Sequence, residues 1–163
     1  MGGSGSTRWN LHWKKTTVEE CKQLPISLFK KAIKHVLDHP GYACKGNVNW
    51  SRNGEPSGNI GYLVHLKNEI PEIRLQYNIV RTEKEMDYPI KFESTKLHWG
   101  SNRWWFICPL IKNGRPCYRR VGKLYLPNGY EYFGCRHCYE LTYTSCQESH
   151  KYDFLFRKIR MPS

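Results

Sequence analysis

The chain has 163 residues, with 26 lysines and arginines against 14 aspartates and glutamates, and a formal net charge of +12. That length suits one domain, or a small domain with a metal-stabilised appendage. No apolar run is long enough for a membrane span or a signal-peptide core, so we expect a cytoplasmic protein with reduced thiols and no membrane partner. The basic charge predicts a polyanionic partner, most often nucleic acid, and the aromatic content of 14% offers stacking surfaces as well as core.

Residues 1–15 are predicted to be a flexible basic and aromatic arm, with a glycine-serine start followed by Trp9 and Trp13. Residues 16–100 are predicted to form a helix plus antiparallel sheet domain. Thr17 and Glu20 have the spacing of a capping box and predict a short helical turn that ends at Leu24-Pro25. A second helix is predicted over 27–37, because apolar residues recur there at helical spacing. These residues are Leu28, Phe29, Ala32, Ile33, Val36 and Leu37.

After this helix the apolar pattern changes to a period of two, which is typical of strands with one buried face. Runs at 60–66, 73–79 and 88–92 alternate in this way, and Asn53-Gly54 predicts a tight turn before them. The connections are too short for crossover helices, so the fold class is predicted to be α+β with an antiparallel β meander and one or two N-terminal helices. The helix should pack on one face of the sheet or cap one of its ends.

Residues 101–163 are predicted to form a zinc ribbon with a C-terminal helix. Cys108 and Cys117 form one pair, Cys135 and Cys138 form a second at knuckle spacing, and residues 119–133 between them predict a hairpin. Four thiolates brought together across a hairpin are the ligands of a structural zinc site, so the predicted cofactor is Zn²⁺. The first pair is wider than in the common two-knuckle pattern, and Asn113-Gly114 predicts a tight turn inside its loop. A disulfide is the weaker interpretation, because paired cysteines in a reducing compartment are more often metal ligands.

Other cysteines and histidines compete for a place in this site. His137 lies inside the knuckle and is interpreted as a surface residue and partner contact. Cys146 and His150 would share a face of a helix over 145–160, either as metal ligands or, as we prefer, as a buried thiol and a packed histidine. Cys21 and Cys44 lack partners at ligand spacing and are interpreted as small core residues.

The most basic stretch coincides with the metal site, because residues 103–123 hold six basic residues and no acidic one. We expect its cations to contact phosphates, and exposed aromatics such as Tyr118 or Tyr125 to stack on bases. The predicted nucleic-acid-binding residues are Arg115, Tyr118, Arg119, Arg120, Lys123 and Arg136.

Five segments carry a resemblance to a known family: Arg103–Pro109, Asn113–Cys117, Lys123–Pro127, Phe133–Tyr139 and Gln147–Lys151. With them the chain resembles a family of small bacterial and phage-associated zinc-ribbon proteins without an established activity. The resemblance covers the last ~60 residues, and the glycine-serine start also resembles that family's start. It implies a bacterial or mobile-element setting and names no partner.

The leading hypothesis is therefore a zinc-stabilised DNA- or RNA-binding protein. The alternative is a phage- or mobile-element-encoded regulator or inhibitor that binds a host protein or nucleoprotein complex. An enzyme that uses Cys146 with His150 or His137 is the weakest hypothesis, because a closed shell of four cysteines has no open position for water. The sequence also holds no clustered carboxylates and no phosphate-binding glycine loop.

Overall fold

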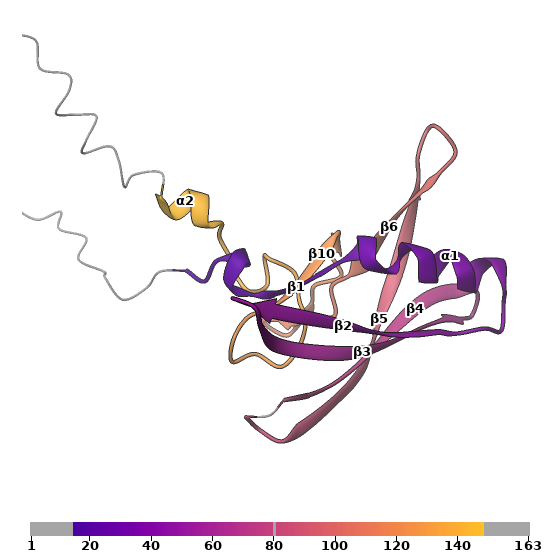
Figure 1. Ribbon diagram of the computed structural model, residues 1–163. Coiled ribbons are helices and arrows are strands. Elements are labelled where there is room, and N and C mark those ends of the chain that lie inside the picture. Colours follow the sequence, from indigo (N-terminus) through magenta and orange to yellow (C-terminus); the bar gives the residue numbers. More distant parts are fainter. Residues whose placement is uncertain (1–14, 80, 149–163) are drawn as a thin grey trace, which may run out of the picture.

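A computed structural model describes residues 15–79 and 81–148 and shows a twisted antiparallel sheet with a helix across one face (Figure 1). Six strands lie in the order β2-β3-β4-β5-β6-β9, and the first five of them are also consecutive strands in the chain. Their bounds are β2 Cys44–Arg52, β3 Glu55–Lys67, β4 Ile70–Ile79, β5 Lys84–Lys96, β6 Asn102–Ile107 and β9 Arg120–Val121. The predicted α+β class and antiparallel meander are confirmed.

Short turns with left-handed backbone connect the first strands. Asn53 and Gly54, between β2 and β3, have φ values of 53° and 85°. Positive φ at both central residues is the requirement of a type I′ turn, whose twist matches that of the two strands it joins. The register then places Val64 opposite Ile73, and Ile73 opposite Ile90. The strand alternation read from the sequence is thereby confirmed.

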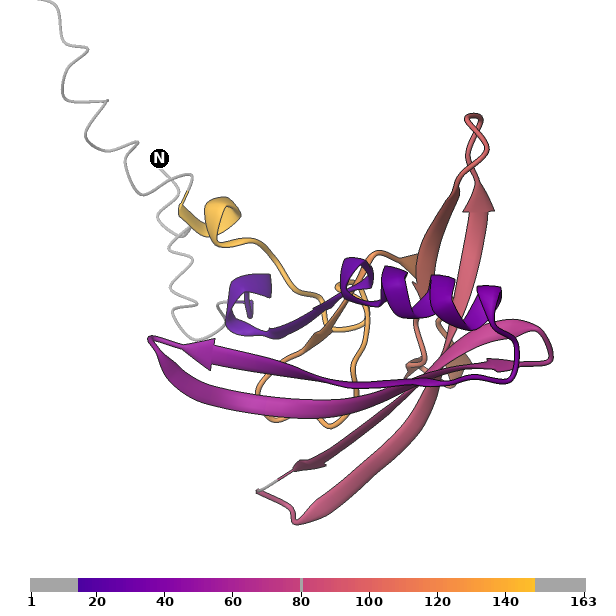
Figure 2. The same cartoon turned by 45° about the vertical axis from the view of Figure 1, so that its right-hand side comes forward.

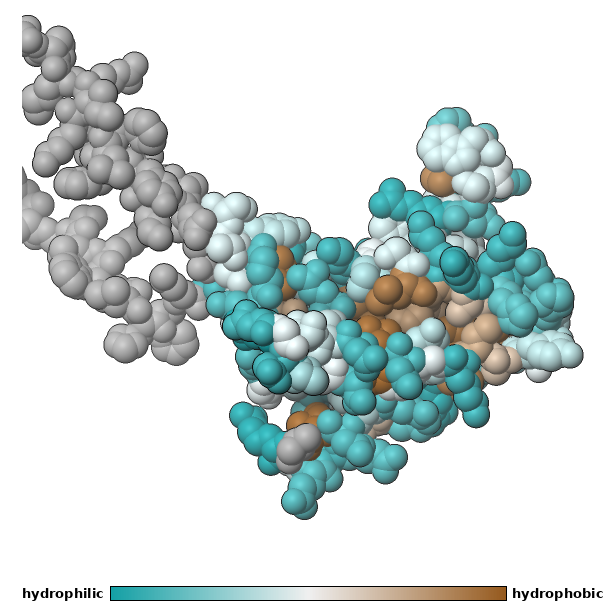
Figure 3. Space-filling view, viewed as in Figure 1, coloured by the Kyte–Doolittle hydropathy of each residue, from teal (hydrophilic) through white to brown (hydrophobic). Residues whose placement is uncertain are grey.

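Helix α1, Lys30–Asp38, follows the 3₁₀ turn η2, Ile26–Phe29, and packs on β3 and its neighbours. Phe29, Ile33 and Val36 are fully buried, whereas Leu28 and Leu37 are 49% and 38% exposed, so the apolar face is narrower than the sequence predicted. Hydrophobic colour gathers where α1 lies over the sheet, on an otherwise mostly hydrophilic face (Figure 3). Burial of this face drives the packing of the helix on the sheet.

A second, two-stranded sheet joins a segment near the start of the described chain to the segment between the cysteine pairs. Strand β1, Lys22–Pro25, pairs with β10, Lys123–Leu126, and places Leu24 opposite Leu124. The capping box is confirmed, since the Thr17 amide donates to Glu20 Oε2 at 2.9 Å, but η1, Val18–Glu20, ends before β1 begins. β1 itself is a strand where the sequence indicated the end of a helical turn.

The segment between the cysteine pairs differs from the predicted hairpin. β9 pairs with β6 and β10 pairs with β1, so 119–133 does not fold as two strands paired only with each other. A single antiparallel bridge, Tyr125 to Gly134, closes the loop. β9 and β10 pair with other strands because the edges of β6 and β1 supply partners for their backbone N–H and C=O groups.

The predicted boundary near residue 100 falls between β5 and β6. These two strands pair over five residues and project together from the sheet as a hairpin (Figure 2). Phe106, Leu124 and Phe133, from the predicted ribbon, are fully buried in the same core as Phe29 and Ile73.

Of the predicted C-terminal helix the structure describes α2, Thr144–Glu148. His150, the rest of that helix and residues 1–14 of the arm lie outside the described residues. No helix within the described ranges is long and apolar enough to cross a membrane.

Candidate metal centre and the basic surface around it

Two loops bring the four cysteines together. The first contains a small hairpin, β7 Ile111–Lys112 and β8 Arg115–Pro116, turned at Asn113 and Gly114 with φ values of 53° and 73°. The Cys117 amide donates to Leu110 O at 2.9 Å, which closes this loop and returns Cys117 to Cys108. The tight turn predicted at Asn113-Gly114 is confirmed, and it explains how a widely spaced pair still converges.

All four sulfur atoms lie within 4.8 Å of one another, in a group that could hold a metal ion. Cys108 Sγ is 3.9 Å from Cys138 Sγ, and Cys117 Sγ is 3.8 Å from Cys135 Sγ. A tetrahedral ion with metal–sulfur bonds of about 2.3 Å holds its ligands about 3.8 Å apart. A disulfide needs sulfurs about 2.05 Å apart, so both of these pairs have the spacing of metal ligands.

Backbone amides of the knuckle, residues 135–138, donate hydrogen bonds to two of the sulfur atoms. The Cys135 amide donates to Cys108 Sγ at 3.3 Å, and the Cys138 amide donates to Cys135 Sγ at 3.4 Å. Such bonds favour the thiolate form, which is the form that binds metal. Cys108 and Cys135 are buried and Cys117 and Cys138 are partly buried.

Ionisation of all four thiols would place four negative charges close together, and a cation would stabilise them. A hydrogen bond between the side chains lowers the pKa of Cys135 and raises that of Cys108, so one thiolate forms readily and a neighbour keeps its proton. Burial raises the pKa of Cys138 to about 12. Four thiolates therefore share this space only when a positive ion offsets their mutual repulsion.

The competing ligands do not join the cluster. His137 is exposed, as expected, and is not a member of the four-sulfur group. Cys146 is exposed on α2, so its interpretation as a buried thiol was wrong. Cys21 is buried in a small cluster with Val18, Tyr125 and Leu141, as expected of a core residue, and Cys44 is half-buried against the main core.

Five of the six predicted nucleic-acid-binding residues line two hollows on the surface beside the knuckle. Arg120, Lys123 and Arg136 line one of about 530 Å³, which we call the basic groove. Arg115 and Arg119 line the other, of about 680 Å³, and His137 lines both. Tyr118 lines neither but is 70% exposed, with a left-handed φ of 47°. The expectation that Tyr125 is exposed was wrong, because its side chain packs in a small core cluster and is 7% exposed. The first three cations are thus brought together, and Arg115 and Arg119 form a separate group.

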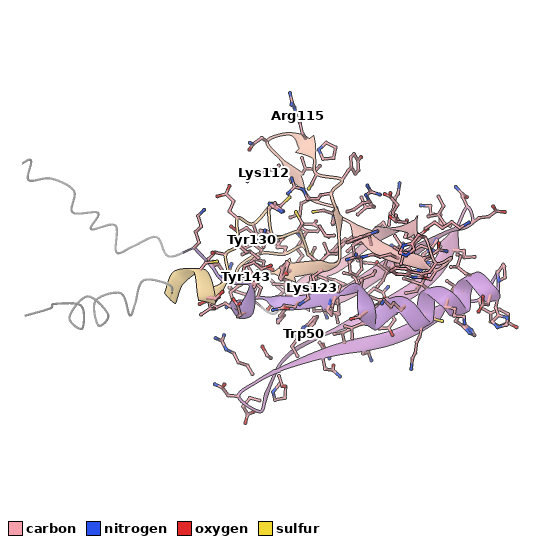
Figure 4. The ribbon with its side chains drawn as sticks, turned by 90° about the horizontal axis from the view of Figure 1, so that it is seen from above. Trp50, Lys112, Arg115, Lys123, Tyr130 and Tyr143 are labelled. Carbon is pink, nitrogen blue, oxygen red and sulfur yellow. The ribbon has the colours of Figure 1, made fainter. Side chains whose placement is uncertain are left out.

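The two groups lie on different parts of the chain's surface. In Figure 4, Lys112 and Arg115 lie on the β7–β8 hairpin, and the Arg115 side chain points away from the body of the molecule. Lys123 and Tyr143 lie closer to β1 and α2 (Figure 4). Lys112 is held by Glu140, with Nζ 2.7 Å from Oε1, whereas Arg115 extends into solvent.

The predicted set of nucleic-acid-binding residues left out two of the five cations of the basic groove, although the sequence placed Arg103 in the most basic stretch. These two cations are Lys30 at the start of α1 and Arg103 on β6, and the aromatic lining of the groove comprises Trp104, Trp105, Tyr125 and Tyr143. These residues are up to 113 positions apart, from Lys30 to Tyr143, and no local pattern joins them. The pairing of β1 with β10 is what brings 25–30 next to 120–125.

No family model, curated protein or solved structure matches this chain.

Proposed function

We propose that this chain is a nucleic-acid-binding protein in which a zinc ion holds the loops that carry its contact surface. The observation that carries the proposal is the basic groove beside the cysteine cluster. Five cations line it, and no acidic residue is among its described lining residues. Such a surface complements a phosphate backbone and raises the local concentration of nucleic acid near the protein.

Zinc is the proposed ion because of the donor set. Four sulfurs in a tetrahedral arrangement suit zinc or an iron–sulfur centre, and zinc is the ion that small loops of this kind usually bind. A shell closed by Cys108, Cys117, Cys135 and Cys138 leaves no position for substrate, so the ion would be structural. Elemental analysis of purified protein should find one zinc per chain and little iron. Protein free of both metals would contradict this assignment.

Binding to nucleic acid is tested by its salt dependence. Titration of labelled DNA and RNA at several salt concentrations should give an affinity that falls as salt rises, since each phosphate contact releases counterions. Replacing Arg120 and Lys123 by Gln should reduce the slope of log affinity against log salt by about 0.7–0.9 per contact. Lys45→Gln and Arg52→Gln, on exposed positions of β2, are matched controls for net charge. Absent binding, or binding indifferent to salt, would refute the function.

A second candidate, a regulator that docks on a host protein, is favoured by one observation. A further hollow of about 680 Å³ is lined by Ile111, Tyr130 and Tyr132, which are 70%, 57% and 41% exposed. Exposed apolar and aromatic side chains of this kind are enriched in protein interfaces. Capture from bacterial lysate after nuclease treatment separates the two roles. A specific protein retained by the parent chain and lost with Tyr130→Ser and Tyr132→Ser would support docking, whereas loss of all material after nuclease would favour nucleic acid.

A further inference from the structure

We propose that the basic groove takes a single strand of DNA or RNA whose bases stack on Trp105 and Tyr143, in preference to a duplex. This inference rests on the proposed nucleic-acid function and adds the form of the nucleic acid to it.

The groove is concave, and that shape favours a single strand. Its lining comes from 25–30, from 103–105, from 120–125, from Arg136 and His137 and from Tyr143, and this open hollow has a volume of about 530 Å³. A protein that reads duplex DNA inserts a protruding helix or β-ribbon into a major groove about 12 Å wide. A hollow cannot enter that groove. It can receive a base that projects from its strand, and single strands offer such bases without the cost of unpairing.

Trp105 is fixed beside open space. Its indole Nε1 donates to Thr95 Oγ1 at 3.1 Å, and the Arg103 guanidinium lies over its ring at 4.1 Å from the centroid. Next to the ring stands Gly122, where an added Cβ would meet only Trp105 Cζ3, at 4.0 Å. A half-buried indole that is held on one side and open on another is a stacking platform.

Tyr143 repeats the arrangement at another part of the groove lining. Its side chain is 41% exposed, and the Arg136 guanidinium lies 5.1 Å from its ring centroid. Each of the two aromatic rings therefore has an arginine beside it. A strand presents bases and phosphates in alternation, so paired rings and cations fit both of its components.

Charge complementarity supports the same occupant. Lys30, Arg103, Arg120, Lys123 and Arg136 all line the groove. Among the described residues, only Arg120 of these five forms an ion pair, with Glu93 at 3.1 Å between Nη1 and Oε1. Both side chains are about half exposed, so a phosphate can replace that carboxylate at little cost.

The test uses the full zinc-loaded chain. Labelled oligo-dT and oligo-U of about 12 nucleotides, and a blunt DNA duplex of the same length, are titrated at one salt concentration. We expect either single strand to bind about tenfold tighter than the duplex, or more, and to quench tryptophan fluorescence. A duplex that binds as tightly or more tightly would overturn this inference and leave the proposed function intact. Failure of all three probes to bind would overturn both.

Variants locate the contact. Trp105→Leu and Tyr143→Leu should each weaken single-strand binding about 5- to 150-fold, the loss expected for one stacked base, and leave the duplex affinity nearly unchanged. Gly122→Glu should place a carboxylate among the cations and block the groove, whereas Gly122→Ala is the matched control. Since Trp105 is half-buried, Tyr143→Leu and Gly122→Glu decide the matter if Trp105→Leu does not fold. Equal losses for single strand and duplex, or unchanged single-strand affinity in these variants, would overturn the inference.

Discussion

At the residue scale, Cys135 is a buried member of the four-cysteine group that could hold a metal ion. It is fully buried, its Sγ is 3.8 Å from Cys117 Sγ, and the Cys138 amide donates to it. Cys135→Ser should weaken zinc binding by more than the 10- to 100-fold that loss of an outer-shell partner costs, because serine is a poor thiolate substitute. Competition with a chelator measures this loss. Cys146→Ser, on exposed α2, is the control, and a Cys135→Ser protein that holds zinc as tightly as its parent would contradict the assignment.

Glu93 is the residue whose replacement should tighten nucleic-acid binding. Its carboxylate pairs with Arg120, which lines the basic groove, and would compete with a phosphate for that guanidinium. Glu93→Gln should tighten nucleic-acid binding by about two- to fivefold at low salt, with little change in stability, because exposed pairs contribute only about 0–1 kcal/mol. Glu85→Gln, at the other end of β5, carries the same change in net charge. An equal gain in both variants would mean that overall charge, not Arg120, is responsible.

At the scale of elements, the sequence predicts well where a pattern is local and long. Residues 60–66 and 73–79 alternate over enough positions to identify β3 and β4, and two Asn-Gly turns were predicted from two residues each. β1 could not be predicted, since four residues ending in Pro25 carry no period. It forms because β10, about 100 residues later, supplies its partner. The cysteines were found by spacing, whereas Lys30 joins the groove through this long-range pairing. Tyr143 joins it through a separate bridge, between its neighbour Thr142 and Thr17.

The loop that carries Cys135 packs too closely to accept a side chain just before it. An added Cβ at Gly134 would lie 2.0 Å from Leu110 Cδ1 and 2.9 Å from Tyr139 Cε2. Gly134→Ala should therefore cost about 1–3 kcal/mol of folding free energy, as expected when a packed site is overfilled, and should weaken metal binding with it. Denaturant unfolding measures the cost. Gly122→Ala, whose Cβ would make only an ordinary contact with Trp105 Cζ3 at 4.0 Å, should be neutral. A neutral Gly134→Ala would show that Leu110 moves aside freely.

At the scale of the whole molecule, the two loops that carry the four cysteines and the large sheet share one core. Phe133, which lies between the cysteine pairs, is fully buried and stacks on Trp50 of β2 with centroids 6.0 Å apart. Its ring is also perpendicular to that of Tyr77 on β4, with the centroids 5.9 Å apart. Loosening of the loops on metal removal should therefore expose part of the core that also holds the sheet together.

We accordingly expect metal removal to destabilise the chain as a unit. An ion that binds only the folded state stabilises it by about 2.7 kcal/mol at 100 times its dissociation constant, so a chelator should lower the melting temperature. Thermal unfolding followed by circular dichroism and by tryptophan fluorescence should give coincident transitions that shift down together. If a chelator moves one transition and leaves another in place, the loops and the sheet unfold separately. The boundary near residue 100 would then divide two domains, as the sequence predicted.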